Sequence, residues 1–316
     1  MLSALKFVQG SIAKKDFVPA LTHFRIKDGV VRGYNGRIAL SSPINLDLDV
    51  TPKAVPFVKA IEACTTTIAL SRSSNGKLYI KSGSFKAFVD CTEEEYPHIA
   101  PEGEYTPTDY PILSVLRKLE PFIAEDASRP WARGILFRGK SVFATNNIIL
   151  VELWTGLSFP CEVVIPYTAV SEIIRLKQEP VAIQVSPTSL TFHFEGERWL
   201  RTQVYDLEWP DIGKVLNQEG NPVPIPKGFF EALLKLKPFL GEGERIYLRE
   251  GQVSTSNEDA EGATIEVPDI RTTACFNHEQ LSNLEGIATA IDFAGYPKPC
   301  LFRGEKLRGA IIGIRL

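Results

Sequence analysis

The sequence repeats itself three times with a period of about 111 residues, and an asparagine marks the same place in each copy. The markers are Asn35, Asn146 and Asn257. A strand-like run lies on each side of every marker, which predicts two strands joined by a turn. Asparagine tolerates the left-handed conformation that tight hairpins require, and Gly36 directly follows the first marker. The chain is therefore expected to fold as three copies of one unit.

Helical periodicity occurs at matching places in each copy. About 30 residues before each asparagine, apolar residues recur at three-to-four spacing, and a second such segment follows each hairpin. The third of these later segments has Asn277 and Gln280 in capping-box positions. The expected helices lie within 2–12, 52–64, 111–122, 166–177, 227–239 and 277–284.

The predicted fold class is α+β. It consists of three tandem domains, each with two helices packed on β-sheets, at residues 1–104, 105–217 and 218–316. With 44% apolar and 23% charged residues, the composition is that of an ordinary soluble protein. We expect no membrane span and no secretory leader, because no apolar run approaches 18 residues. Five cysteines without CxxC spacing favour a reducing cytoplasm over a disulfide framework.

Charge is distributed unevenly along the chain. The six expected helices contain ten lysines or arginines and five acids, or +5, whereas the remaining residues sum to −8. Lysines on the solvent face of an amphipathic helix are routine, so this contrast has an ordinary explanation. If all six helices faced one surface, however, they would form a positive lining suited to a phosphate backbone.

The sequence contains no recognisable catalytic constellation. The histidines at 23, 98, 193 and 278 are scattered, and neither metal-ligand spacing nor a glycine-rich phosphate loop is present. The acidic run at 93–95 is more typical of a solvated edge than of a metal site. We therefore expect no enzymatic activity, no cofactor and no bound metal.

Several short motifs in order along the chain resemble one known family. Residues 310–316 are similar to the terminal Val-Val-Met-Pro-Met-Arg-Leu of the bacterial-type DNA polymerase sliding clamp, the β subunit processivity factor. Residues 143–150 resemble its Val-Ala-Thr-Asp-Gly-His-Arg-Leu, and residues 209–212 its Tyr-Pro-Asp-Tyr. Weaker similarities lie at 15–21 and 95–97. Together these motifs span nearly the whole chain.

The resemblance implies a protomer of three similar domains. Two protomers would close head to tail as a homodimeric ring around double-stranded DNA, with helices lining the channel. The ring would bind DNA without sequence specificity and would tether a DNA polymerase after a clamp loader had placed it on DNA. The place of action would be the cytoplasm of a bacterial or infected cell.

The resemblance also places a partner-peptide pocket between domains two and three. Polymerases and clamp loaders of the family insert a short apolar motif there. Read without the family, the alternating aliphatic residues at these positions are more typical of a strand facing the core than of a pocket. The corresponding residues are Ala132, Thr145, Asn147, Ile148, Ile149, Leu150, Pro210, Lys214, Val215, Ala310, Ile312, Gly313, Ile314 and Arg315.

Candidate DNA contacts come from two sources. The expected helices supply Lys6, Lys53, Lys59, Arg117, Lys118, Arg175, Lys177, Lys235 and Lys237. The resemblance adds Lys15, Arg129 and Trp131, of which the tryptophan is expected to be either an exposed aromatic that touches DNA or a core residue.

The sequence departs from the family pattern at the pocket. Asn147 replaces a glycine, Ile148 and Ile149 replace a His-Arg pair, and Gly313 replaces a proline. These changes predict a more apolar and more flexible pocket, with a peptide preference specific to one dedicated polymerase. Together with the short chain, they suggest a phage-encoded clamp; a gene within a chromosomal replication operon would argue against that origin.

Candidate subunit contacts are large apolar residues near the expected edge strands of domains one and three. Core positions are an equal alternative for them. Two other functions stay open, a clamp-fold interaction module that does not encircle DNA and a β-rich enzyme or virion component. The candidate contacts are Phe85, Phe88, Leu236, Phe239 and Leu240.

Overall fold

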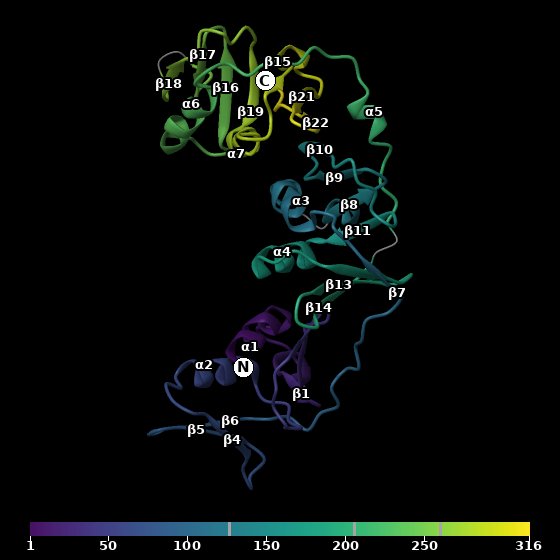
Figure 1. Ribbon diagram of the computed structural model, residues 1–316. Coiled ribbons are helices and arrows are strands. Elements are labelled where there is room, and N and C mark those ends of the chain that lie inside the picture. The colour runs from purple at the N-terminus through teal and green to yellow at the C-terminus, as the bar shows by residue number, and fades with distance from the viewer. Residues whose placement is uncertain (126–127, 205–206, 259–260) are drawn as a thin grey trace. The chain divides into compact units, whose positions relative to one another are not determined.

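The computed structural model describes residues 1–125, 128–204, 207–258 and 261–316. The chain forms two compact units (Figure 1). The first comprises residues 1–114 and 165–205, and the second comprises 115–164 and 206–316. Each unit therefore holds one whole outer repeat together with about half of the middle repeat. The three-domain boundaries stay a prediction.

A seven-stranded antiparallel sheet forms the centre of the first unit. Its order is β1-β2-β3-β14-β13-β12-β7. Strand β3 of the first repeat pairs directly with β14 of the middle repeat, with Leu40 opposite Leu200. The strands are β1 (Arg25–Lys27), β2 (Val30–Tyr34), β3 (Ile38–Pro43), β7 (Glu104–Pro107), β12 (Ala182–Val185), β13 (Ser189–Phe194) and β14 (Arg198–Gln203).

Three helices and a smaller sheet complete the first unit. Helix α1 (Leu2–Val8) packs on α2 (Ala54–Glu62) and on β3, and the Phe7 ring lies 5.7 Å from that of Phe194 on β13. Helix α4 (Tyr167–Leu176) begins directly after Pro166, as a proline near the first turn predicts. The smaller sheet has the order β4-β5-β6, comprising β4 (Ala69–Arg72), β5 (Leu78–Ser82) and β6 (Phe85–Val89).

The second unit is built around the sheet β11-β8-β9-β10-β22-β21-β20-β15. Strand β10 of the middle repeat pairs with β22 of the third repeat, with Leu150 opposite Ala310. These strands are β8 (Gly134–Arg138), β9 (Ser141–Thr145), β10 (Ile149–Trp154), β11 (Val163–Pro166), β15 (Val223–Pro224), β20 (Ala290–Ile291), β21 (Cys300–Gly304) and β22 (Leu307–Ile311).

A four-stranded sheet and short helices complete the second unit. The sheet order is β18-β17-β16-β19, comprising β16 (Arg245–Arg249), β17 (Gln252–Ser254), β18 (Thr264–Glu266) and β19 (Ala274–Asn277). The helices are α5 (Gly213–Leu216), α6 (Phe229–Leu236) and α7 (His278–Ser282). Helix α3 (Ile112–Leu119) carries the chain from the first unit into the second. All six expected helices are thus present.

Short 3₁₀ turns extend or connect these elements. They are η1 (Gln9–Ser11), η2 (Pro19–Thr22), η3 (Glu120–Phe122), η4 (Pro130–Ala132), η5 (Lys237–Phe239) and η6 (Phe293–Gly295). Within the described residues, no helix is long and apolar enough to cross a membrane.

The marker asparagines play a different part from the predicted one. None of them has a positive φ; the residue that follows the first two markers does, Gly36 at 85° and Asn147 at 72°. The side chains of Asn35 and Asn146 instead accept hydrogen bonds from the backbone N–H groups two and three residues further on. The asparagine therefore closes the turn through its side chain, and its neighbour takes the left-handed conformation.

Candidate functional site

An apolar cavity of about 270 Å³ lies in the second unit, where β10 meets β22. The turn between β9 and β10 forms one wall, and the end of β22 and residues 210–215 form others. Ile148 and Ile312 are 39% and 47% exposed, which is unusual for large aliphatic side chains. Both are held in place because Ile312 N–H donates to the Ile148 carbonyl at 2.9 Å.

A pair of packed aromatic rings supports the cavity. Trp131 lines the cavity, and its ring packs edge-on against Trp209, with 5.3 Å between the ring centroids. Trp209 belongs to a core cluster with Leu136, Phe143, Val164 and Leu216. Close packing of this kind makes the floor of the cavity rigid.

The β9–β10 turn sets the shape of the cavity mouth. Asn147 takes the left-handed conformation that a glycine would otherwise supply, so the turn survives the departure from the family pattern. Its N–H donates to Thr145 Oγ1 at 3.1 Å, and its Oδ1 accepts from Arg129 Nη1 at 3.0 Å. Arg129 and Asp211 are the charged residues that line this cavity.

Gly309 allows β22 to approach β10 closely. A Cβ at this position would lie 2.4 Å from the Leu150 carbonyl oxygen and 2.2 Å from the Phe302 ring. Any side chain would therefore separate the strands that form the cavity wall. The sequence analysis did not single out this glycine.

Nine of the fourteen predicted pocket residues line this cavity. Ala132, which is fully buried, does not, and Lys214 lies outside on α5. Gly313, Ile314 and Arg315 also lie outside it. The nine that line it are Thr145, Asn147, Ile148, Ile149, Leu150, Pro210, Val215, Ala310 and Ile312.

The cavity also contains residues that were not predicted for it. Arg129 and Trp131 were assigned to DNA, whereas Asp211, Ile212 and Pro299 were not assigned. The Trp-Pro-Asp-Ile motif at 209–212 was the available signal, because the motif places Asp211 and Ile212 directly after Pro210.

Gly313 is a point of close packing. A Cβ there would come within 2.7 Å of the Tyr296 ring, and Tyr296 donates its hydroxyl to the Ile314 carbonyl at 2.7 Å. The Ile314 N–H donates to the Cys275 carbonyl at 2.7 Å. The terminal segment is thus fixed on two sides, contrary to the flexibility predicted from replacing proline by glycine.

The predicted DNA-binding cations are mostly exposed, with Lys118 half-buried. Arg175 is the clearest departure, because its guanidinium is committed to internal contacts. It donates to Glu172 at 2.5 Å and to the carbonyls of Lys6 and Phe7 at 3.2 and 2.9 Å. Arg175 therefore joins α4 to α1, and Lys6 itself pairs with Glu62 at 2.9 Å.

Trp131 is partly buried against Trp209 and also lines the apolar cavity, so it is neither a fully exposed nor a fully buried residue. A fully exposed aromatic, Phe17, lies two residues after Lys15. Asp16 Oδ1 accepts the Val18 N–H at 2.9 Å and so shapes this loop. The sequence analysis missed Phe17 because nothing in its spacing separates it from a buried phenylalanine.

The predicted subunit contacts divide into exposed and buried residues. Phe88 on β6, an edge strand of the small sheet, and Phe239 in η5 are each 60% exposed. Phe85 and Leu240 are half-buried. Leu236 is 1% exposed and belongs to the buried residues of α6, which is the core alternative that the sequence left open for it.

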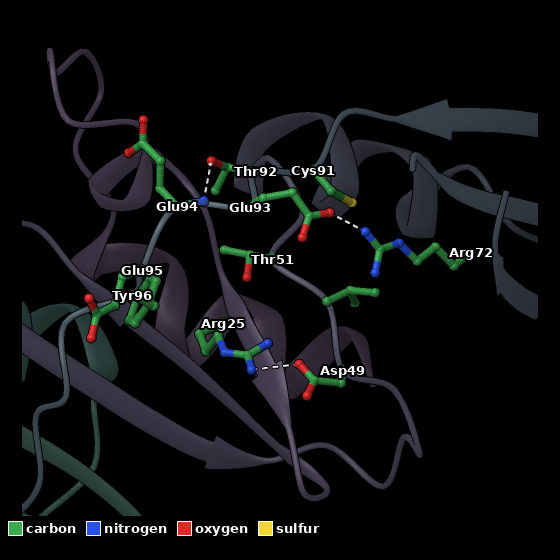
Figure 2. A pocket seen from close by; sticks show the side chains of 11 residues that line it. Arg25, Asp49, Thr51, Arg72, Cys91, Thr92, Glu93, Glu94, Glu95 and Tyr96 are labelled. Atoms are coloured by element: carbon green, nitrogen blue, oxygen red, sulfur yellow. Dashed lines mark hydrogen bonds and ion pairs between the residues drawn. The ribbon is translucent and has the colours of Figure 1, made fainter. Parts of the chain in front are cut away.

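A larger polar cavity of about 570 Å³ lies in the first unit (Figure 2). Two ion pairs lie in its lining. Arg25 reaches Asp49 at 2.5 Å, and Arg72 donates to Glu93. The guanidinium of Arg25 holds the pKa of the Asp49 carboxyl below its usual value. Both arginines of the lining are thus already paired with carboxylates of the chain itself.

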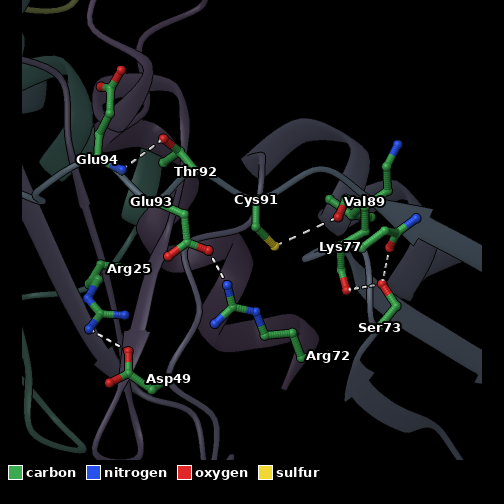
Figure 3. A network of polar contacts seen from close by, with 11 residues as sticks. Arg25, Asp49, Arg72, Ser73, Lys77, Val89, Cys91, Thr92, Glu93 and Glu94 are labelled. Atoms are coloured by element: carbon green, nitrogen blue, oxygen red, sulfur yellow. Dashed lines mark hydrogen bonds and ion pairs between the residues drawn. The ribbon is translucent and has the colours of Figure 1, made fainter.

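The same network extends past Cys91 toward Lys77 (Figure 3). Lys77 pairs with Asp90 at 2.7 Å and lowers the pKa of that carboxyl. Burial raises the pKa of the Cys91 thiol, which disfavours the reactive thiolate. In the part of the chain that the structure describes, no group of three or more His, Cys, Asp or Glu could hold a metal ion.

Comparison with solved structures identifies the fold. A DNA polymerase sliding clamp from Bacillus subtilis is 17% identical, with 100% of this chain and 97% of that one covered and a TM-score of 0.84. A C. crescentus beta sliding clamp (18%, TM-score 0.83) and a Pseudomonas aeruginosa DNA polymerase III subunit beta, bound to griselimycin (18%, TM-score 0.79), match over the same shares. No family model matches the sequence, and no curated protein is similar to it by sequence. The chain therefore has the fold of the bacterial DNA polymerase sliding clamps.

Proposed function

We propose that this chain is the protomer of a DNA sliding clamp. Two copies, each with three similar domains, close head to tail into a ring around double-stranded DNA in the cytoplasm and tether a DNA polymerase. The observation that carries this proposal is the likeness to solved sliding clamps over the full length of the chain, with a TM-score of 0.84. A clamp acts through topology, so the chain needs no catalytic group.

The surface chemistry supports nonspecific contact with DNA. Lys53 and Lys59 on or beside α2, and Lys235 and Lys237 around α6, are exposed. Cations of this kind attract phosphates without reading bases, and exposed contacts of modest strength permit sliding. Lys15, with the exposed ring of Phe17 nearby, belongs to the same candidate set.

The apolar cavity supports a partner-peptide pocket. Its exposed aliphatic residues, Ile148 and Ile312, lie over a rigid aromatic floor, which suits the insertion of apolar anchors. Clamp loader and polymerase are the partners proposed for it. The two isoleucines at 148 and 149 favour a purely apolar anchor on this side of the pocket.

Encirclement is tested by DNA topology. Light scattering at micromolar concentration should give twice the mass of one chain, and a monomer would favour a clamp-fold interaction module instead. Protomers are then diluted until they separate and are concentrated with circular plasmid, so that rings close around DNA. The clamp should co-elute with the circle and be released after linearisation; retention on the cut DNA would contradict encirclement.

The pocket is tested separately with a labelled peptide of leucine, serine and phenylalanine. Ile148→Glu should weaken its binding by about tenfold or more, because a carboxylate would be buried beside the apolar anchor. Val223→Glu is the matched control, since Val223 is an exposed aliphatic residue of the same unit that lies outside the cavity. Equal loss in both variants would contradict the assignment.

A further inference from the structure

A second cavity, of about 240 Å³, lies in the first unit where β3 meets β14. It occupies the place in the first repeat that the apolar cavity occupies in the middle repeat. Ala39 lies opposite Arg201 in the β3–β14 pair, as Leu150 lies opposite Ala310 in the β10–β22 pair. The two cavities are therefore formed by the same junction of two repeats, built twice.

The remaining walls correspond as well. Ile99 follows a Tyr-Pro pair in the first repeat, as Ile212 follows the Trp-Pro pair in the second, and each lines its own cavity. Thr188 stands directly before β13, as Pro299 stands directly before β21. One fold feature thus provides two concave sites of similar size.

The chemistry of the two sites differs. Arg37 stands where the apolar cavity has Ile148, Arg201 where it has Ala310, and Gln203 where it has Ile312. Among the residues that the structure describes, the lining of the cavity in the first unit includes two arginines and no acid.

Both arginines have hydrogen-bonding capacity to spare. Arg37 is exposed, and its backbone N–H is fixed by Asn35 Oδ1 at 3.0 Å. Arg201 is 18% exposed and pairs with Glu102 at 2.8 Å through Nη2. Its Nε is buried and has no hydrogen-bond partner among the described residues. Two guanidinium groups that line one cavity and keep unused terminal N–H donors favour an anionic ligand.

We propose that this cavity binds an acidic peptide segment of a partner protein. Carboxylates of the segment pair with Arg37 and Arg201, and a small apolar side chain packs on Ile99 and Ala39. The planar guanidinium fork pairs with carboxylates and phosphates alike, but Ile99 and Ala39 offer apolar contact that a peptide can use and a free phosphate ion cannot. Thr188 and Gln203 supply hydrogen-bonding groups for the peptide backbone. The proposal goes beyond the clamp function and does not require that the chain encircles DNA.

The test uses a labelled ten-residue peptide of alternating glutamate and leucine, and the same peptide with glutamine for glutamate. We expect the acidic peptide to bind more tightly than the glutamine peptide. Arg37→Glu should weaken its binding by about tenfold or more, because it replaces an attractive charge by a repulsive one. Arg201→Gln should also weaken it, and circular dichroism shows whether this partly buried site still folds.

The matched control is Arg32→Glu, an exposed arginine on β2 that does not line the cavity. Equal loss in Arg32→Glu and Arg37→Glu would overturn the proposal, since it would show general attraction to a basic surface. Loss only in Ile148→Glu would place the peptide in the apolar cavity instead. Equal affinity for the glutamine peptide, or displacement by millimolar phosphate or a thymidine oligonucleotide, would also overturn it.

Discussion

The turns at Asn35 and Asn146 have the same backbone and different surroundings. Asn35 Oδ1 accepts two N–H groups, each at 3.0 Å, and Asn146 Oδ1 accepts the equivalent pair at 3.1 and 2.8 Å. The next residue has a positive φ in both. The residue after that is Arg37 in one turn and Ile148 in the other. The same turn backbone therefore presents an arginine beside the β3–β14 pair and an isoleucine beside the β10–β22 pair.

The largest expected loss of stability comes from a change in β22, the strand that pairs with β10 beside the Asn146 turn. Gly309 on β22 is matched by Leu200 on β14, so only the second junction depends on a glycine. Gly309→Ala should destabilise the protein by about 3 kcal/mol, because its Cβ would meet backbone and the Phe302 ring. Urea unfolding measures the change. Gly241→Ala, with open space around it, is the control and should change little.

Removing the first two marker asparagines should have unequal effects. Asn146→Ala should cost about 2 kcal/mol and Asn35→Ala about 1 kcal/mol, because Asn146 also donates to Gln280 on α7 at 2.5 Å. Thermal unfolding of the two variants tests the order; equal losses would show that the contact with Gln280 adds nothing.

Exchanging the left-handed residues should have a smaller effect. Gly36→Asn and Asn147→Gly should each change stability by only a few tenths of a kcal/mol, because both residues tolerate a positive φ. Gly36→Ala and Asn147→Ala should each cost about 1 kcal/mol. The same urea titration measures all four. If the alanine variants lost no more stability than the exchanged variants, the left-handed backbone conformation would not determine the stability of these turns.

Acid should produce the smallest change, and we expect it to act on the first unit. Burial lowers the pKa of His23 and His193 from the ordinary 6.5. The unfolded chain therefore binds more protons between the folded and unfolded pKa values, and stability falls as the pH drops below about 6.5. Urea midpoints at pH 7.5 and 5.5 measure the loss. It should shrink in a His23→Gln, His193→Gln double variant, and an unchanged loss would contradict the assignment.

The sequence predicted the positions of the helices better than the directions in which individual side chains face. Apolar spacing located six of the seven α-helices in the described residues, because a helix that faces the core repeats its apolar residues every 3.6 positions; α5, with four residues, is too short to show that period. The same spacing could not show that Leu236 faces the core, nor that Trp131 packs on Trp209. Asn277 Oδ1 caps α7 as predicted by accepting the Gln280 N–H at 3.1 Å, but the Gln280 side chain accepts from Asn146, 134 residues away. A contact at that separation leaves no local signal.

The sequence motifs located the candidate pocket, but tertiary contacts decide which residues line it. The resemblance reached Thr145, Ile148 and Ile312 because they lie within or beside the quoted motifs. Arg129 lies at the cavity because its side chain donates a hydrogen bond to Asn147. Gly313 does not line the cavity, because Tyr296 packs against the terminal segment there. Such contacts depend on which segments meet, and that information is distributed over the whole chain.

The pairing of β3 with β14 has a consequence for synthesis on the ribosome. Strand β3 ends at Pro43, and its partner is complete only at Gln203. During translation the nascent first repeat therefore has an unsatisfied strand edge while the next 160 residues, about half of the chain, are made. Open edges of this kind recruit other chains. Cotranslational folding of the first unit must wait for the middle repeat, and fragments that end near residue 104 are expected to aggregate.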